Sequence, residues 1–341
     1  MNHKKENKIT VQLVTWNSKL YLPSCIKSLF DQTYRDFNIL VIDNASRDGS
    51  IEWLKSNYPD IYILKNVKNL GYSRAHNHGL NLQHSPFVLL MNPDVILENK
   101  FLEIAIKTLE EKNNYASLCG KLKRFHFSHG DLNEPVDDGI IDATGLLIKR
   151  NYQVLNRGAG EKDYGQYNLS TNVFGGSGAL TLYRRQALDA VAYKNQVLDE
   201  TLFAYKEDVD IAWRLQLNGW NCWYEAKAGA LHYREVKDKV NQSNKAIAQA
   251  RKSKSSYVNY LSYRNHIMVV LKNAFISNYF RQLPSIAWYE LKKLTYLLLR
   301  EWHTLTAWKE VIMNLSKIKR YRKYNKQIIQ RSPSEMKKWY Q

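Results

Sequence analysis

Several polar residues follow apolar, strand-like runs in the first two-thirds of the chain. Asp43 comes directly after Ile39-Leu-Val-Ile, and Asp94 follows Val88-Leu-Leu-Met through the tripeptide Asn92-Pro-Asp. His232 follows a run of small residues. In open α/β sheets ligands bind outside the carboxyl ends of the strands. We therefore take these three residues as candidates for a binding site.

Each of these residue types suits a different task. A carboxylate at Asp43 could accept hydrogen bonds from a nucleobase imide or a ribose hydroxyl, although a cap or turn role remains open. Magnesium on a diphosphate is held by one or two carboxylates together with phosphate oxygens. Asp94 could supply such a ligand, but Asn-Pro-Asp is also a common turn. His232 on its own fits a structural role as well as a ligand.

A further cluster of carboxylates precedes a predicted helix at Glu207-Asp-Val-Asp. Acidic residues stabilise a helix N-terminus through the helix dipole, which is one explanation for the cluster. The other is a general base held beside a substrate hydroxyl. The sequence has no Walker A loop, no G-x-G-x-x-G after the first strand, no H-E-x-x-H and no G-x-S-x-G.

Periodicity predicts the elements that must position these residues. Strand-like and helix-like segments alternate in the first half, which favours an α/β fold with a mostly parallel sheet and flanking helices. Predicted strands cover residues 9–15, 38–42, 62–64, 86–91, 179–183, 222–225 and 230–233, and predicted helices cover 21–30, 51–57, 73–82, 101–112, 185 onward and 211–217. Residues 125–172 predict a variable loop or a small antiparallel excursion. Beyond residue 240 the pattern is helical, basic and aromatic.

The positive charge is concentrated at one end. The chain has 341 residues and a net charge of +18, yet residues 1–234 carry 28 Lys/Arg against 26 Asp/Glu. Residues 235–341 carry 22 against 6. Such asymmetry indicates an anionic partner, either nucleic acid or an anionic membrane surface. Three scattered cysteines form no disulfide framework, and no run of 18 uncharged apolar residues predicts a membrane span.

In this order, the motifs resemble the family-2 inverting glycosyltransferases of the GT-A fold. The resemblance covers residues 9–235. It rests on Val11-Gln-Leu-Val-Thr-Trp-Asn-Ser, Asp43-Asn-Ala-Ser-Arg-Asp-Gly-Ser, Asn69-Leu-Gly with Asn77-His-Gly, Asn92-Pro-Asp in place of the DxD motif, Glu207-Asp-Val-Asp as the "ED" motif, and Leu231-His-Tyr. It implies a catalytic domain over residues 1–235 and a C-terminal region, 236–341, for membrane or acceptor association.

The resemblance also implies a role for each matched residue. Asp208 would be the catalytic base, and Asp94 and His232 would hold a divalent metal, Mg²⁺ or Mn²⁺. Glu207, Asp210 and Arg214 would bind or support the acceptor. Donor contacts would come from Thr15, Asn17, Asp43, Asn69, Gly71, Asn77, Asn92 and Gly176.

Three segments resemble those of bacterial rhamnosyltransferases: Asn92-Pro-Asp, Phe203-Ala-Tyr-Lys-Glu-Asp-Val-Asp and Tyr263-Arg-Asn. Enzymes of that kind use dTDP-L-rhamnose and polyprenyl-diphosphate-linked acceptors. Two features depart from that pattern: Lys206 replaces an apolar or small residue, and Arg234-Glu-Val follows the histidine. A UDP-sugar donor is the alternative. The Gln-x-x-Arg-Trp motif of processive synthases is absent. We expect a cytoplasmic enzyme on the inner face of the membrane, with no nucleic-acid partner. A nucleic-acid-binding protein would explain the basic tail but not the strand-end residues.

Overall fold

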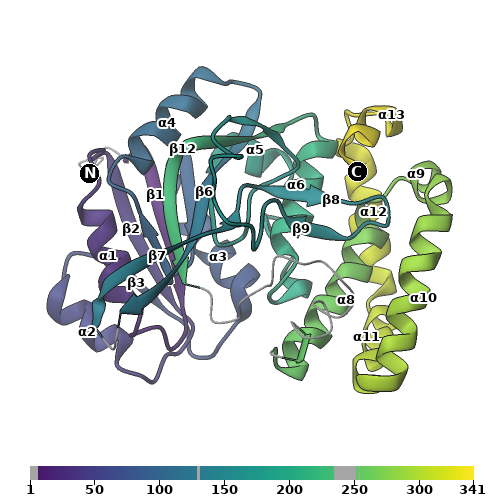
Figure 1. The fold of residues 1–341 in the computed structure, drawn as a ribbon, viewed down its shortest axis with the longest axis horizontal. Coiled ribbons are helices and arrows are strands. Elements are labelled where there is room, and N and C mark those ends of the chain that lie inside the picture. The colour runs from purple at the N-terminus through teal and green to yellow at the C-terminus, as the bar shows by residue number, and fades with distance from the viewer. Residues whose placement is uncertain (1–6, 129–130, 234–250, 253) are drawn as a thin grey trace.

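The computed structural model describes residues 7–128, 131–233, 251–252 and 254–341 (Figure 1). A central mixed sheet has the strand order β10-β12-β6-β11-β4-β1-β2-β3, with β5 paired to β12 and β7 paired to β6. Neighbours from β4 to β3 run parallel, as do β6 and β12, whereas β11 runs antiparallel to both of its neighbours. The predicted α/β class is confirmed.

The strands are β1 (Ile9–Thr15), β2 (Phe37–Asp43), β3 (Tyr62–Lys65), β4 (Phe87–Met91), β5 (Val95–Leu97), β6 (Tyr115–Ser128), β7 (Asp131–Ala143), β8 (Leu146–Ile148), β9 (Val154–Asn156), β10 (Thr171–Val173), β11 (Leu180–Arg184) and β12 (Asn221–Tyr233). The helices of the first 233 residues are α1 (Leu22–Phe30), α2 (Ser50–Asn57), α3 (Gly71–Leu82), α4 (Phe101–Glu111), α5 (Arg185–Ala190), the 3₁₀ turn η1 (Glu200–Leu202) and α6 (Glu207–Leu217).

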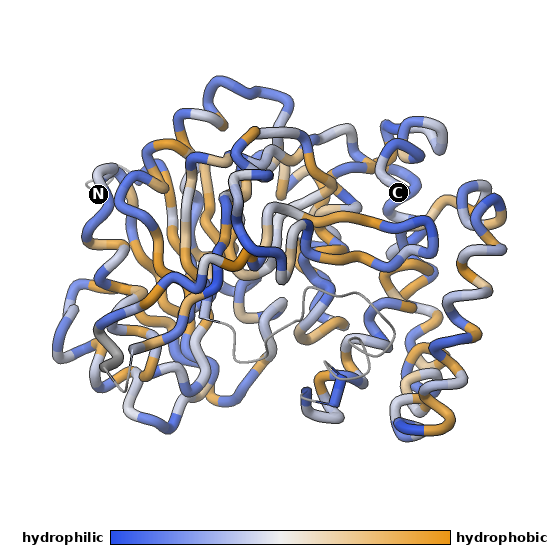
Figure 2. Tube along the Cα trace, in the orientation of Figure 1, coloured by the Kyte–Doolittle hydropathy of each residue, from blue (hydrophilic) through white to orange (hydrophobic). Residues whose placement is uncertain are grey.

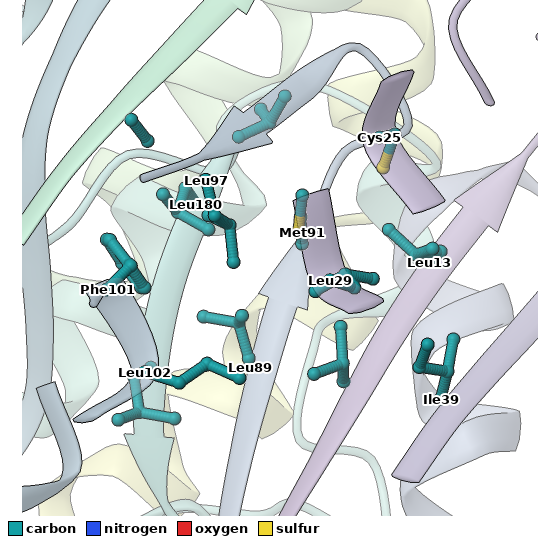
Figure 3. Packing of buried hydrophobic residues seen from close by; sticks show 14 of the residues in the cluster. Leu13, Cys25, Leu29, Ile39, Leu89, Met91, Leu97, Phe101, Leu102 and Leu180 are labelled. Carbon is teal, nitrogen blue, oxygen red and sulfur yellow. The ribbon is translucent and has the colours of Figure 1, made fainter. Parts of the chain in front are cut away.

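Helices cover both faces of the sheet because its central strands are apolar on both sides. Leu13, Leu89 and Met91 pack with α1 and α4 in one buried cluster (Figure 3). Val88 and Leu90 point to the opposite face and pack with α3, α5 and α6. Continuous apolar runs of this kind are typical of parallel strands that are buried on both faces. Figure 2 shows the same strands as the most hydrophobic part of the trace.

The structure refines several sequence predictions. The segments 222–225 and 230–233 form one strand, β12, which has a register shift against β6 between Glu225 and Gly229. The acidic cluster lies inside the first turn of α6 and not ahead of the helix. Residues 125–172 include the antiparallel β6–β7 and β8–β9 pairs, as the excursion alternative predicted. β5 and the first part of β6 were not predicted, because a three-residue strand and a strand without alternation give little periodic signal.

The C-terminal region is helical as predicted. Its elements are α8 (Ser256–Asn273), α9 (Ile276–Arg281), α10 (Leu283–Arg300), η2 (Trp302–Thr306), α11 (Ala307–Met313), α12 (Leu315–Ile328), α13 (Pro333–Met336) and η3 (Lys337–Trp339). No helix in the described ranges is long and apolar enough to cross a membrane.

These helices share a hydrophobic core with the first part of the chain. Met268 and Val269 of α8 and Val311 of α11 pack in one cluster with Phe174 and Trp213. The expected boundary after residue 235 lies outside the described residues. The common core ties the C-terminal helices to α6, which carries the predicted base.

Candidate active site

The ends of β1 and β2 bring two predicted donor residues into register. Thr15 lies opposite Asp43 in the parallel pair, and both are buried. The Asp43 carboxylate accepts hydrogen bonds from the backbone N–H of Ser46 at 3.1 and 3.3 Å. Thr15 Oγ1 is buried without a hydrogen-bond partner among the described residues. Thr15 Oγ1 is thus an exception to the rule that buried hydroxyls have partners, at the carboxyl end of the sheet beside Asp43.

The loops after these two strands brace each other. Asn17 has a left-handed φ of 52°, and its side-chain oxygen accepts the backbone N–H of Arg47 at 2.8 Å. Its own N–H donates to Ser46 Oγ at 2.9 Å. Asn17 is thereby held beside Thr15 and Asp43, the two other residues of this edge for which the family resemblance predicts donor contacts.

The predicted metal ligands, Asp94 and His232, lie together. His232 on β12 pairs with Val95 on β5, so its ring stands next to the residue before that strand. His232 Nε2 is 3.4 Å from Asp94 Oδ1. That oxygen is buried and makes no hydrogen bond within the described part of the chain, as expected of a metal ligand.

A residue that sequence reasoning missed fixes the histidine ring. Asp142 on β7 is fully buried, and its Oδ2 lies 2.8 Å from His232 Nδ1. Arg124 Nε lies 3.6 Å from the other oxygen of Asp142. Burial alone would lower the pKa of His232, but Asp94 and Asp142 outweigh it and raise that pKa to about 10. Metal-ligating histidines commonly donate their second ring N–H to a carboxylate in this way.

The donor set fits a divalent cation shared with a ligand. No group of three or more His, Cys, Asp or Glu side chains placed to hold a metal occurs in the described ranges. As predicted ligands, Asp94 and His232 would provide two positions, and the others would come from ligand oxygens and water. Magnesium is commonly held by one or two carboxylates together with phosphates and water, and Asp94 would be the carboxylate here.

The predicted base, Asp208, stands at the start of α6. Its Oδ2 accepts the backbone N–H of Gly178 at 3.1 Å, which turns the carboxylate toward the Gly-rich turn before β11. Its neighbour Glu207 is 7% exposed, and Oε2 of Glu207 has no hydrogen-bond partner among the described residues. Burial and the charge of Asp208 raise the pKa of Glu207 to about 8. The two adjacent carboxyls therefore differ in their contacts, because Asp208 accepts a hydrogen bond from Gly178 and Oε2 of Glu207 accepts none from the described residues.

The loop that leads into α6 is held in an unusual conformation. Phe203, Tyr205 and Lys206 all have φ between 64° and 72°, a region that non-glycine residues rarely adopt. The side-chain amide of Asn265 on α8 donates to the carbonyl oxygens of Leu202, Ala204 and Tyr205 at 2.7–2.8 Å. This clamp from the C-terminal region fixes the approach to the predicted base.

The same loop packs against the start of α3. Asn69 Oδ1 accepts the N–H of Gly71 at 2.8 Å, and Ser73 N–H donates to Phe203 O. A Cβ on Gly71 would lie 2.5 Å from the Phe203 carbonyl and ring, and φ there is +80°. The predicted donor residues Asn69 and Gly71 thus determine how α3 meets the loop before Asp208.

Other predicted residues contact the protein and not the cavity. Asn77 exchanges hydrogen bonds with the backbone of Leu198 at 2.8 and 2.9 Å. A Cβ on Gly176 would lie 2.2 Å from Thr181 Oγ1, so the glycine permits a close approach to β11. The contacts of both residues are with other parts of the protein.

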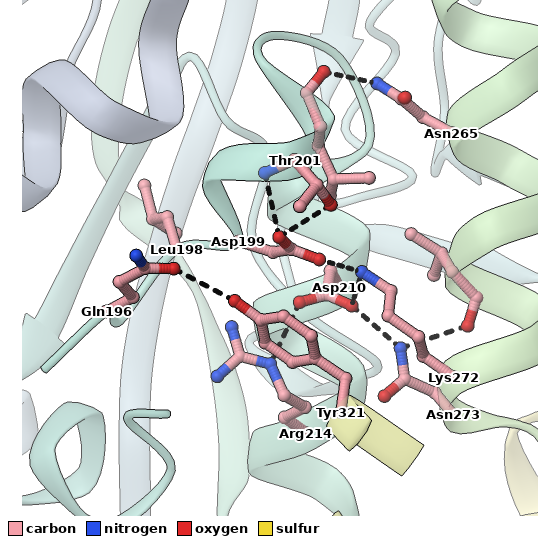
Figure 4. Close-up of polar contacts among 12 residues, drawn as sticks. Gln196, Leu198, Asp199, Thr201, Asp210, Arg214, Asn265, Lys272, Asn273 and Tyr321 are labelled. Carbon is pink, nitrogen blue, oxygen red and sulfur yellow. Dashed lines mark hydrogen bonds and ion pairs between the residues drawn. The ribbon is translucent and has the colours of Figure 1, made fainter. Parts of the chain in front are cut away.

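The predicted support residues Asp210 and Arg214 belong to a buried ion network (Figure 4). Arg214 Nε donates to Asp210 Oδ2 at 2.9 Å, and Lys272 of α8 pairs with Asp210 Oδ1 at 3.2 Å. Lys272 also pairs with Asp199. The network joins α6 to α8, so the support that Asp210 and Arg214 give is to the base-bearing helix.

A cavity of about 680 Å³ is lined by the predicted base, by the predicted metal ligand His232 and by residues of the C-terminal helices. One set of lining residues comes from the strand ends and α6: Asn92, Ser177, Gly178, Asp208 and His232. Another comes from α8 and α10 and includes Tyr263, His266 and Lys293. Thr15, Asn17 and Asp43 are not among the described residues that line it. The C-terminal helices therefore form part of the cavity wall.

Comparison with known proteins identifies the family. The family model described as glycosyl transferase family 2 matches residues 10–192. N-acetylglucosaminyl-diphospho-decaprenol L-rhamnosyltransferase of Mycobacterium tuberculosis is 27% identical over 247 residues, which cover 66% of this chain and 76% of that protein. Glycosyltransferase GlyA of Streptococcus pneumoniae is 32% identical over 110 residues, 31% of this chain. The matches span only 16% of GlyA and 30% of a cholesterol galactosyltransferase of Borreliella burgdorferi.

Solved structures share the fold. GalNAc-T7 with UDP, GalNAc and Mn²⁺ aligns over 87% of this chain and 58% of that one, with a TM-score of 0.56 and 11% identity. The mannosyltransferase PcManGT of Pyrobaculum calidifontis, in complex with GDP-Man and Mn²⁺, covers 95% of this chain and 86% of its own, with a TM-score of 0.50 and 12% identity. The expected GT-A fold is confirmed, and the chain belongs to glycosyl transferase family 2.

Proposed function

We propose that the protein is an inverting glycosyltransferase that moves a sugar from a nucleotide donor to a saccharide acceptor, in the synthesis of a bacterial cell-surface polysaccharide. The observation that carries the proposal is that the carboxylate of Asp208 and the ring of His232 line the same cavity, with Asp94 next to the ring. A base and a diphosphate-binding pair beside one space are what a single displacement needs.

We assign the nucleotide-sugar donor to the residues at the carboxyl ends of β1, β2 and β4. Thr15, Asn17 and Asp43 would contact the nucleoside, and Asn92, which is at the end of β4, would face the diphosphate or sugar. Asp94 and His232 would hold Mg²⁺ or Mn²⁺, which supplies charge neutralisation to the diphosphate leaving group. Asp142 keeps the histidine ring oriented for that contact.

Asp208 carries out the proton transfer. The acceptor hydroxyl loses its proton to the Asp208 carboxylate while its oxygen bonds to the anomeric carbon. The bond from that carbon to the diphosphate oxygen breaks on the opposite side, so the configuration inverts. Burial and the neighbouring Asp208 raise the pKa of Glu207 to about 8, which favours a neutral Glu207 beside the proposed base near pH 7.

The sugar we favour is L-rhamnose, from dTDP-rhamnose, with a polyprenyl-diphosphate-linked saccharide as acceptor. The support is the motif pattern, together with a relative named as an L-rhamnosyltransferase acting on N-acetylglucosaminyl-diphospho-decaprenol. A UDP-sugar is the alternative donor. A lipid-linked acceptor would place the enzyme on the cytoplasmic face of the membrane.

The exposed surface of the C-terminal region supports membrane contact. Trp288, Leu291, Leu294 and Leu298 of α10 are between 42% and 60% exposed, beside exposed cations such as Lys292. Helices that bury apolar and aromatic side chains at a membrane interface and carry cations have this character. Cations near an anionic leaflet contribute about 1 kcal/mol each.

A donor screen tests the proposal. The full-length protein is incubated with dTDP-rhamnose, with dTDP- and UDP-linked hexoses, and with GDP-mannose, each with Mg²⁺ or Mn²⁺, and release of nucleoside diphosphate is measured with and without a short-chain lipid-linked saccharide. We expect acceptor-stimulated release of dTDP, abolished by Asp208→Asn. Release from a UDP-sugar alone would select the alternative donor, and no release from any donor would contradict the proposed activity.

A further inference from the structure

The cavity has a cationic wall that the proposed chemistry does not use. Lys206 enters from the loop before α6, Lys293 from α10, and Arg251 and Lys254 from the segment just before α8. These side chains share the cavity with Asp208. Arg251 pairs with Glu301, so the candidate anion ligands of this wall are Lys206 and Lys293.

Lys206 is held in place through a backbone carbonyl. The residue adopts φ of 72°, and its Nζ donates to the carbonyl oxygen of Val154 at 3.4 Å. Among the described residues, Asp208 and Glu207 act on the charge of Lys206 through space and not through a hydrogen bond. An amine that is half-buried with one long hydrogen bond has donors left for a ligand.

Lys293 is also withdrawn from solvent. Its side chain is 15% exposed, and its Nζ lies 3.4 Å from Glu290 Oε1. The ammonium group is 4.4 Å from the ring centre of Tyr263 and 5.3 Å from that of Tyr289. One carboxylate and two aromatic faces hold Lys293 at the cavity wall and leave N–H donors available.

The ionisation behaviour agrees with an excess of positive charge here. Burial lowers the pKa of Lys206, and Lys254 lowers it further, against the opposite effect of Asp208. Burial, together with Arg251 and Lys206, lowers the pKa of Lys293 to about 8 although Glu290 opposes the change. A bound anion would relieve both costs.

We propose that Lys206 and Lys293 form a phosphate subsite that receives the diphosphate of a polyprenyl-linked acceptor. This inference rests on the proposed function and adds a second anion site to it. Donor phosphates are assigned to Asp94 and His232 at the strand ends, whereas this subsite is built from the loop before Asp208 and from α10. A diphosphate held there would keep the first sugar of the acceptor near the base.

The position of α10 agrees with a lipid-linked ligand. Tyr289 and Lys293 line the cavity, while Leu291, Leu294 and Leu298 on the other faces of the helix are exposed. Figure 1 shows α10 at the outer edge of the molecule, and Figure 2 shows hydrophobic segments along it. A prenyl chain leaving the subsite would therefore meet an apolar helix surface.

The test measures binding without turnover. Calorimetry in EDTA compares farnesyl diphosphate, inorganic pyrophosphate and dTDP on the wild-type protein and on the double variant Lys206→Gln/Lys293→Gln. We expect farnesyl diphosphate to bind at least tenfold more weakly to the variant, because each lost charge-assisted hydrogen bond is worth about that factor. dTDP affinity, measured again with Mg²⁺, should change less than twofold.

Matched variants keep the result specific. Lys55→Gln/Lys194→Gln removes two exposed lysines that do not line the cavity, and should bind as wild type. Lys206→Arg/Lys293→Arg keeps both charges and should retain farnesyl diphosphate binding, which separates charge from folding. Thermal melts check that each variant is folded.

Three results would overturn the inference. One is unchanged farnesyl diphosphate binding in the Gln double variant. Another is an equal loss for dTDP, which would assign the lysines to the donor. The third is inorganic pyrophosphate binding as tightly as farnesyl diphosphate, which would assign the subsite to a phosphate without a lipid. Since no step depends on turnover, failure of the donor screen would leave this measurement readable.

Discussion

Asp142 and His232 are hydrogen-bonded at 2.8 Å inside the protein, from β7 to β12, while the other ring nitrogen of His232 faces Asp94. The Asp142 carboxylate holds Nδ1 and leaves Nε2 of the ring facing Asp94. A histidine held in this way keeps its Nδ1–H on Asp142 and would bind a metal through Nε2, with the Nε2 proton released to solvent. The pair makes Asp142 a positioning residue for the proposed metal.

Asp142→Asn should weaken Mn²⁺ binding to the dTDP complex by about 10- to 100-fold, as is common when a carboxylate behind a ligating histidine is altered. Binding of dTDP in EDTA should be unchanged. Asp138→Asn is the control, since Asp138 contacts His126 Nδ1 at 2.6 Å on the same hairpin, at the surface. Calorimetry measures both, and equal Mn²⁺ affinity in the two variants would remove Asp142 from the metal site.

Asp208→Asn should lower kcat by about 10²–10⁴-fold, the usual contribution of a general base, and leave donor binding nearly intact. Glu207→Gln should lower it less, because Glu207 is buried beside the base. Steady-state rates with the donor found in the screen decide this. An Asp208 variant that keeps more than about a tenth of wild-type kcat would place the base elsewhere.

Glu207 should make stability depend on pH in a direction opposite to that of most carboxyls. Its pKa is about 8 in the folded protein and about 4.3 in an unfolded chain. The folded state therefore binds more protons between these values, and the free energy of unfolding falls as pH rises through this window. Urea unfolding at pH 5, 6, 7 and 8 should show a smaller decline for Glu207→Gln than for wild type. Parallel curves would contradict the raised pKa.

Asn265→Ala should affect both stability and catalysis through the loop before α6. It leaves three carbonyl oxygens, those of Leu202, Ala204 and Tyr205, without their shared donor. We expect a loss of about 1–3 kcal/mol in the free energy of unfolding, together with a lower kcat. Asn314→Ala is the comparison, because Asn314 donates only to Glu310 of the preceding helix. A destabilised variant with wild-type kcat would show that the clamp does not position Asp208.

Membrane binding should have a salt-sensitive and a salt-resistant part. Lys319, Arg320 and Lys323 of α12 are exposed, and replacing them with Glu should reduce flotation with anionic vesicles at low salt. Arg322 should be left intact, because it donates to Leu271 O at 2.6 Å and Ala274 O at 2.8 Å. Flotation equal to wild type at low and high salt would exclude this basic run as a membrane contact.

The apolar part is tested separately. Leu291→Ser/Leu294→Ser/Leu298→Ser on α10 should reduce the binding that survives high salt, since burial of exposed leucines is not screened by ions. Leu299→Ser, at the end of the same helix and 76% exposed, is a single-site comparison. An unaffected triple variant would show that α10 does not enter the interface.

Local sequence signals predicted the positions of residues that lie at the end of a strand or the start of a helix. Asp43, Asp94 and Asp208 each follow a recognisable run or open a helix, and the structure places them at such positions. Asp142 was not predicted, because its partner is 90 residues away and nothing near it marks a strand end. The long-range register of β7, β6 and β12 decides that contact.

The same limit applies to Asn77 and Arg214. A motif match suggested ligand contacts, but their polar atoms bind the backbone at Leu198, Val191 and Val197. Whether an amide or guanidinium faces a cavity or a backbone is decided by tertiary packing. One sequence does not contain that information in any local pattern.

The buried network around Lys272 has a consequence for engineering and for how such enzymes diversify. Lys272 arrives from α8, and its two carboxylates, Asp199 and Asp210, belong to the first part of the chain. A chimera that exchanged residues 251–341 for the tail of a relative lacking this lysine would bury two acidic groups with less positive charge, at a cost of about 3–5 kcal/mol. A graft of a foreign tail should therefore be accompanied by changes at Asp199 and Asp210.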